Sequence, residues 1–262
     1  METTLADGIG RRASPIRRDF IERPSDSDAP TPLSRLLRTQ GNLGGKGGGL
    51  RVSLLLTLIW VNARPPHSSS RVPSYWARLL RRDDPDGEGA RTIRECLYEL
   101  ESRGFITLVQ SGQRQEIFLH NEARPERGRQ AKNLYRLPYG RDTYVQVPRT
   151  FWTEGLAGTL SGAATAMYLV ALAMTRHDDP DFFLAGEFFQ ERFGISRSSK
   201  KRGLAELVER DVLNVESVAD RDPDTFRMTR RNIYTVKRGF LQPEPWIGDV
   251  ERRVNSSNAT GK

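Results

Sequence analysis

The chain has 262 residues, a formal net charge of +8 and a single cysteine, Cys96. This length suits one or two domains, and the basic balance favours a polyanionic partner such as nucleic acid or an anionic surface. A lone cysteine excludes an internal disulfide and a cysteine-based zinc site, and no apolar run approaches the ~20 residues of a membrane span. The polar start is unlike a signal peptide, so we expect a cytoplasmic location.

The first 45 residues predict a basic arm followed by a hinge. Residues 1–32 are rich in Arg, Asp, Ser and Pro without periodicity, which is typical of a disordered tail. Its arginines, Arg11, Arg12, Arg17 and Arg18, either follow DNA phosphates or are merely solvated. A short helix is expected over 33–38, and the glycine-rich run 41–49 excludes a regular element.

Residues 46–141 predict a first folded unit. Apolar spacing, Pro73 at a helix start, Gly104 at a helix end and a Ser-Gly turn at Ser111 mark its elements. In chain order they are helices over 50–63, 73–81 and 90–103, strands over 105–109 and 115–120, a polar basic loop over 121–132 and a strand over 134–137.

Residues 142–241 predict a second unit, and 242–262 a disordered C-terminal tail. Ser161 and Ser196 are the N-caps of two of its helices, and Phe188, Phe189 and Phe193 are expected to face inward. The expected elements are a strand over 145–147, helices over 161–175, 184–193 and 197–210, and strands over 212–218 and 232–236.

The two units contain an internal repeat. Residues 92–106 and 199–213 align without a gap at an offset of 107, sharing Leu, Glu, Leu and Arg at the same spacing. A second match, 133–137 with 232–236, follows at an offset of 99. Two matches in the same order favour a duplicated domain. We therefore predict an α+β chain, mainly α, made of two units that each have their own core.

The element order helix, helix, turn, helix, strand, basic loop, strand resembles the winged helix-turn-helix family. In the first copy Ile93, Cys96, Leu97 and Leu100 share the core face of the third helix. The resemblance implies that the opposite face of this helix, and the loop between the strands, contact DNA. The expected contact residues on the helices are Arg91, Thr92, Arg94, Glu95, Tyr98, Arg197, Ser198, Lys200, Lys201 and Arg202. Those expected on the wings, the strand-and-loop segments that follow each third helix, are Arg114, Arg127, Arg129, Arg227, Arg230 and Arg231.

Two positions depart from the repeated pattern. Lys200 stands where the first copy has the core residue Ile93, and Asp211 stands where the first copy has Gly104. Both changes concern the second unit, so the packing of its helices cannot be copied from the first unit residue by residue.

Other candidate sites fail on spacing. The run Gly44-Gly45-Lys46-Gly47 has glycine where a phosphate loop needs Ser or Thr, and His67, His120 and His177 lack metal-ligand spacing. The five phenylalanines between residues 182 and 193 are assigned to the core rather than to base stacking. We expect no cofactor, no metal and no enzymatic activity.

These observations predict a non-enzymatic protein that binds double-stranded DNA, with no membrane partner and with homodimerisation left open. Tandem winged helices in one chain are similar to plasmid replication initiator proteins and to tandem winged-helix transcription regulators. The sequence does not separate DNA replication from transcription regulation. The alternative is a winged-helix scaffold that binds protein partners without reading bases.

Overall fold

The computed structural model describes residues 5–24, 28–38, 47–112, 114–126, 133–184, 186–221 and 228–243. Within these residues the fold is α+β and mainly helical, with three small antiparallel sheets, so the predicted α+β, mainly α class is confirmed, while the two winged-helix domains stay a prediction. None of the helices in the described ranges is long and apolar enough to cross a membrane.

The first unit begins with a helix whose residues are almost all buried. Pro73 opens its second helix, and Gly104, with φ +83°, follows the third. The predicted helices are therefore confirmed with shifted ends. The elements are α3 (Gly48–Val61), β2 (Ser68–Ser69), α4 (Pro73–Leu79), α5 (Glu88–Ser102), β3 (Ile106–Ser111) and β4 (Arg114–Leu119).

The second unit follows the same order. Ser161 and Ser196 cap its first and third helices as predicted, because each hydroxyl oxygen accepts a hydrogen bond from the backbone N–H three residues on, at 3.2 Å. The elements are α8 (Gly162–Met174), β6 (Asp181–Phe182), α9 (Gly186–Phe193), α10 (Arg197–Glu209), β7 (Leu213–Arg221) and β8 (Met228–Val236).

The two units share sheet order and strand register. The sheets run β2-β4-β3 and β6-β8-β7, so in each unit the last strand is central. Leu119 pairs with Ile106 in the first sheet, and Val236 pairs with Leu213 in the second. Ile106 and Leu213 are equivalent in the 107-residue repeat, so Leu119 and Val236 are equivalent as well. The counterpart of β8 is therefore β4.

This register corrects the second sequence match. We predicted a strand over 134–137 equivalent to 232–236, but the described part of that segment forms only an isolated bridge between Leu134 and His120. The central place in the sheet is already held by β4, between β2 and β3. The shared Asn-x-Tyr letters therefore do not mark equivalent positions.

The predicted disorder of residues 1–32 is wrong for 5–24 and 28–32. A 3-10 turn η1 (Leu5–Gly8), strand β1 (Ala13–Arg17) and short helix α1 (Arg18–Ile21) are folded there, and α2 (Pro32–Leu37) follows. Ile16, Phe20 and Ile21 are fully buried. β1 pairs antiparallel with β5 (Tyr144–Pro148), which precedes α6 (Thr150–Thr153) and α7 (Leu156–Thr159). The arginines of β1 and α1 are thus part of the fold and not of a free arm.

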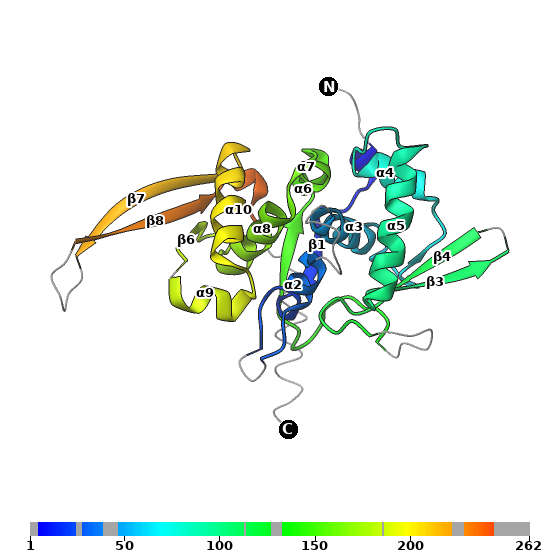
Figure 1. The fold of residues 1–262 in the computed structure, drawn as a ribbon, viewed down its shortest axis with the longest axis horizontal. Helices are drawn as coiled ribbons and strands as arrows, with labels where there is room; N and C mark the ends of the chain where they lie inside the picture. Colours follow the sequence, from blue (N-terminus) through cyan, green and yellow to red (C-terminus); the bar gives the residue numbers. More distant parts are fainter. Residues whose placement is uncertain are drawn as a thin grey trace.

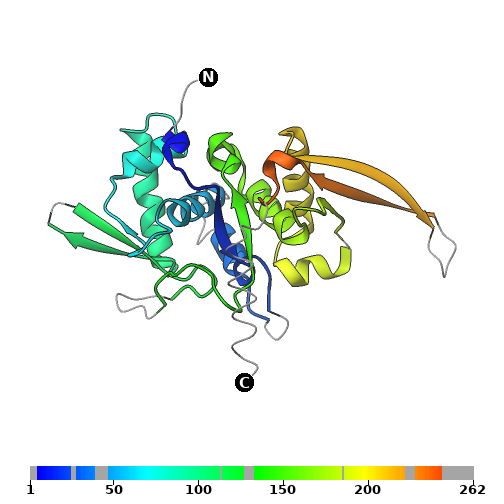
Figure 2. The same cartoon turned by 180° about the vertical axis from the view of Figure 1, so that it is seen from behind.

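Strands β1 and β5 lie side by side in the middle of the molecule, with the two units on either side (Figure 1). Seen from behind, the hairpins β3–β4 and β7–β8 extend outward at opposite ends (Figure 2). After β8 a single turn η2 (Arg238–Phe240) leads back to the middle, where Gln242 hydrogen-bonds to the backbone of Leu172 and of β5.

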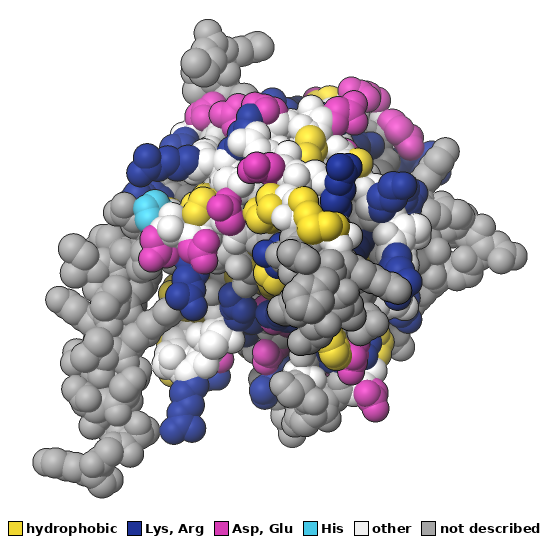
Figure 3. Space-filling view, turned by 90° about the vertical axis from the view of Figure 1, so that its left-hand side faces the viewer, with side chains coloured by type: hydrophobic (Ala, Val, Ile, Leu, Met, Phe, Trp, Pro, Cys, Tyr) yellow, Lys and Arg dark blue, Asp and Glu magenta, His cyan; other side chains and the backbone are white. Residues whose placement is uncertain are grey.

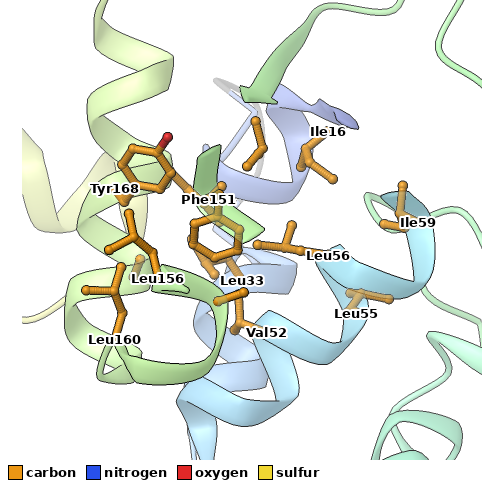
Figure 4. Packing of buried hydrophobic residues seen from close by; sticks show 14 of the residues in the cluster. Ile16, Leu33, Val52, Leu55, Leu56, Ile59, Phe151, Leu156, Leu160 and Tyr168 are labelled. Carbon is orange, nitrogen blue, oxygen red and sulfur yellow. The ribbon is translucent and has the colours of Figure 1, made fainter. Parts of the chain in front are cut away.

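The buried side chains form one cluster that draws on both units, which differs from the separate cores we predicted. Trp60 of α3 stacks on Trp152 of α6 with ring centroids 4.2 Å apart, and the Trp152 indole N–H donates to Thr57 at 2.9 Å. Val52 and Phe151, from different halves of the chain, meet in the same cluster (Figure 4). Because α3 and α8 are buried on nearly all sides, each is covered in part by the other unit, and neither unit has a complete core of its own.

A buried ion pair fastens β1 to the first unit. The backbone N–H and the guanidinium of Arg17 both donate to the carboxylate of Glu122 at 2.9 Å, and the guanidinium also reaches Asp142 at 3.2 Å. Glu122 is fully buried, and this burial raises the pKa of its carboxyl above the ordinary value although Arg17 opposes the shift. The pair thus depends on Arg17 being in place.

Candidate nucleic-acid interface

Helix α10 presents a basic surface at its N-terminal half. Its buried side, Gly203, Leu204 and Leu207, packs on α8 so closely that a Cβ on Gly203 would lie 2.4 Å from the Ala163 carbonyl oxygen. The opposite side is therefore turned to solvent. There Arg197, Ser198, Lys201 and Arg202 are exposed, and the three cations have no ion-pair partner within the described ranges.

Lys200 is placed differently from these cations. It is half-buried, with its ammonium 4.8 Å from the ring centre of Phe189, and burial together with Arg197 lowers its pKa below the ordinary value. Its first-unit equivalent, Ile93, is fully buried. Lys200 therefore covers apolar surface with its stem and is less exposed than its neighbours, and its contact with DNA stays a prediction.

The hairpin β7–β8 extends the basic surface of α10. Its two strands have nine residues each, and Arg230 and Arg231 are exposed on β8. Because they are adjacent in a strand, they point to opposite faces of the hairpin. Arg231 lies over the ring of Phe183 at 5.2 Å. Arg230 is thus the cation of this pair on the free face; Arg227 lies outside the described residues.

Helix α5 is the equivalent of α10 but is less basic. It contains two arginines against four glutamates, whereas α10 contains four cations against two glutamates. Arg91 forms ion pairs with Glu88 and with Glu95, the latter at 3.2 Å. The Thr92 hydroxyl bonds to the Glu88 carbonyl oxygen. The side chains of α5 that remain exposed and unpaired in the described part of the chain are Arg94 and Tyr98.

The first hairpin carries one described candidate. Arg114 is exposed beside the turn that joins β3 to β4. Arg127 and Arg129 lie outside the described residues. The basic contribution of the first unit therefore rests on Arg94 and Arg114, which is smaller than that of the second.

Two phenylalanines that we assigned to the core are exposed. Phe188 is 69% and Phe183 is 51% exposed, while Phe189 and Phe193 are buried. They border a shallow groove of about 320 Å³ with Arg192 on its edge. The signal was present in the sequence, because adjacent residues in a strand or helix point in different directions and cannot all face inward.

A larger cleft of about 570 Å³ lies at the surface between the units, at the first turns of α3, α8 and α10. It does not suit an anion, because Glu206 already accepts hydrogen bonds from the backbone N–H and hydroxyl of Ser161 at the start of α8. Among the residues with described positions, no three His, Cys, Asp or Glu side chains are grouped to hold a metal. His120 instead bonds to Thr107 and to the Gly104 carbonyl oxygen.

The end of the molecule with the second unit is shown in Figure 3. In this view Lys and Arg side chains are spread over both sides, several of them along the right-hand side, which is the side that faces the viewer in Figure 1, and acidic side chains gather at the top. Comparisons with protein-family models, curated proteins and solved structures found no match to this chain. Topology and side-chain chemistry are therefore the grounds for a functional proposal.

Proposed function

We propose that both units are winged helix-turn-helix domains and that the chain binds double-stranded DNA through α10, α5 and the two hairpins. The element order and the sheet order, with a short strand, two helices and a closing hairpin in each unit, support the winged-helix assignment. The observation that carries the DNA-binding proposal is the group of exposed cations Arg197, Lys201 and Arg202 at the start of α10, which have no ion-pair partner in the described part of the chain.

The position of these cations is unfavourable for the isolated protein. The N-terminus of a helix carries a partial positive charge, so Arg197 in the first turn of α10 reduces stability by a few tenths of a kcal/mol, and Lys201 and Arg202 in the next turn reduce it by less. The same partial charge and the free backbone N–H groups attract phosphate. A DNA backbone therefore relieves a repulsion that the protein cannot relieve internally within its described residues.

We propose that the two units make different kinds of contact with DNA. The second supplies most of the attraction to phosphates, since Arg197, Lys201, Arg202 and Arg230 are exposed and have no ion-pair partner among the described residues. The first supplies side chains suited to base edges, because Arg94 binds a guanine edge bidentately and the Tyr98 ring contacts apolar groups in the groove.

The test is a titration of a fluorescent duplex by anisotropy at several salt concentrations. We expect log K to fall against log[salt] with a slope of about −4 to −8, and Arg230→Ala to flatten it by about 1. The control variant Arg141→Ala removes an exposed arginine from the connection between the units. A slope near zero would favour a protein-binding scaffold instead.

The same interface serves transcription regulation or the initiation of plasmid replication, and the two roles predict different DNA states. An initiator melts DNA next to its site, whereas a regulator leaves the duplex paired. Permanganate reactivity of thymines beside the bound site distinguishes them.

A further inference from the structure

The two units are related by an internal twofold axis. A half turn about the line of sight in Figure 1 carries α2 onto α7, α3 onto α8, α4 onto α9 and α5 onto α10, and carries one hairpin onto the other. The axis runs through the middle of the molecule, beside β1 and β5.

The β1–β5 pairing shows the same symmetry residue by residue. Both strands have the same burial pattern, and each is followed directly by the sequence Arg-x-Phe, at Arg18 and at Arg149, where a short helix starts. Aligned on these arginines, Pro15 and Gln146 are equivalent, and they pair with each other. On either side of this pair, Ser14 pairs with Val147 and Ile16 pairs with Val145. Since Ser14 is equivalent to Val145 and Ile16 to Val147, a half turn exchanges these two pairs, as a twofold axis through an antiparallel ribbon requires.

A close crossing of α3 and α8 gives a second point on the axis. Gly49 and Gly162 are equivalent, because they are separated by the same offset as β2 and β6, which hold the same place in their two sheets. A Cβ on Gly49 would lie 2.8 Å from the backbone nitrogen of Gly162, and a Cβ on Gly162 would lie 2.9 Å from that of Gly49. Each glycine thus meets its own counterpart, and neither tolerates a side chain.

A twofold axis places α5 and α10 on the same side of the molecule and runs them in opposite directions. DNA-binding proteins with twofold symmetry align their symmetry axis with that of the DNA site. The DNA-contacting helix of each half, here α5 or α10, then lies against one of two inverted half-sites. We infer that this chain, as a monomer, reads a DNA site made of two half-sites in inverted orientation. The inference rests on the proposed DNA-binding function and adds the geometry of the target.

The two half-sites differ in sequence because the exposed faces of the helices differ. At the offset of the repeat, Arg91, Arg94, Glu95 and Tyr98 of α5 correspond to Ser198, Lys201, Arg202 and Ala205 of α10. The natural site therefore does not read as a palindrome, and its symmetry shows only when the two helices are made alike.

The experiment makes the exposed positions of α5 match those of α10. In the full chain, R91S, R94K, E95R and Y98A are combined, so that these four exposed positions of α5 carry the residues of their α10 counterparts, and duplexes are selected from a randomised pool with the wild type and the variant. We expect the wild type to select two unlike half-motifs at a fixed spacing. The variant should select a single half-motif twice, in inverted orientation.

Each outcome decides the inference. A directly repeated half-motif, or a half-motif present once, would overturn the inverted geometry and leave DNA binding standing. Enrichment of no duplex by the wild type would overturn the proposed function itself. If the variant does not fold by circular dichroism, hydroxyl-radical footprints of the wild type replace it: protections symmetric about the site centre support the inference, and protections related by translation refute it.

Discussion

Lys201 is the side chain of α10 on which the proposed contact with DNA is most directly tested. It is exposed, unpaired within the described ranges, and held on a helix whose other side is locked against α8. We expect Lys201→Ala to weaken binding to a selected duplex by about 1–3 kcal/mol with the fold intact, because a contact with phosphate or a base edge is lost. Anisotropy measures the loss, and Arg141→Ala is the matched control. Equal affinities for the two variants would remove α10 from the interface.

Glu122 makes stability depend on pH. Burial raises the pKa of the Glu122 carboxyl in the folded state. At a pH between the ordinary and the raised pKa, the folded protein therefore keeps a proton that the unfolded chain has lost. The stability from this residue is complete below the ordinary Glu pKa, about 4.3, and declines as pH rises through the raised value.

Glu122→Gln isolates this effect because the amide does not titrate. We expect the free energy of unfolding of the wild type, measured against that of the variant by urea denaturation, to fall as pH rises through this window and then to level off. A difference that stays constant with pH, or that grows, would show that Arg17 sets the pKa of Glu122 rather than burial.

The sequence could predict which face of each third helix is exposed, but not how its side chains are engaged. The helical period placed Arg94 and Arg197 on the outside, which the structure bears out. The pairing of Arg91 with Glu95 and the position of Lys200 over Phe189 depend on rotamers and on a neighbouring helix. The helical period alone predicts neither contact.

At the scale of elements, local signals were reliable. Ser161 and Ser196 cap helices as predicted, since a side-chain hydroxyl acts within three residues. Gly104 and Asp211 occupy the same position after α5 and α10, and both have positive φ, +83° and +61°. The aspartate thus accepts a backbone conformation that usually favours glycine. Such signals are local, and therefore readable from the chain.

Strand β1 could not be read in this way. Ile16 and Phe20 sit among arginines, serines and prolines, so the composition is that of a disordered tail. What orders them is β5, more than 120 residues further on. Pairings over such distances leave no periodicity in a five-residue strand.

Ile16→Ala tests whether β1 is a structural strand. Its side chain is fully buried in the shared core, so its truncation leaves a cavity between the units, and we expect a loss of about 2–5 kcal/mol in the free energy of unfolding. Arg12→Ala, one residue before the strand and exposed, should change it by less than about 0.5 kcal/mol. Chemical denaturation compares them, and similar small losses in both would mean that β1 is not needed for the fold.

At the scale of the whole molecule, the shared core predicts one unfolding transition. Cutting the chain into 40–141 and 142–245 separates Trp60 from Trp152 and removes β1 from β5. We therefore expect the intact chain to melt in a single cooperative step and neither fragment to melt cooperatively by itself. Calorimetry on the three samples decides it, and a sharp transition in either fragment would restore the view of two independent domains.

The crossing of Gly49 and Gly162 has a consequence for how the protein behaves on dilution. Symmetric readers built from two chains come apart as their concentration falls, so their site occupancy mixes assembly with binding. Here the two faces that meet at the axis belong to one chain, and their association does not depend on how many molecules are present. Site occupancy should therefore follow a simple hyperbola down to the lowest concentrations, with each molecule arriving already assembled.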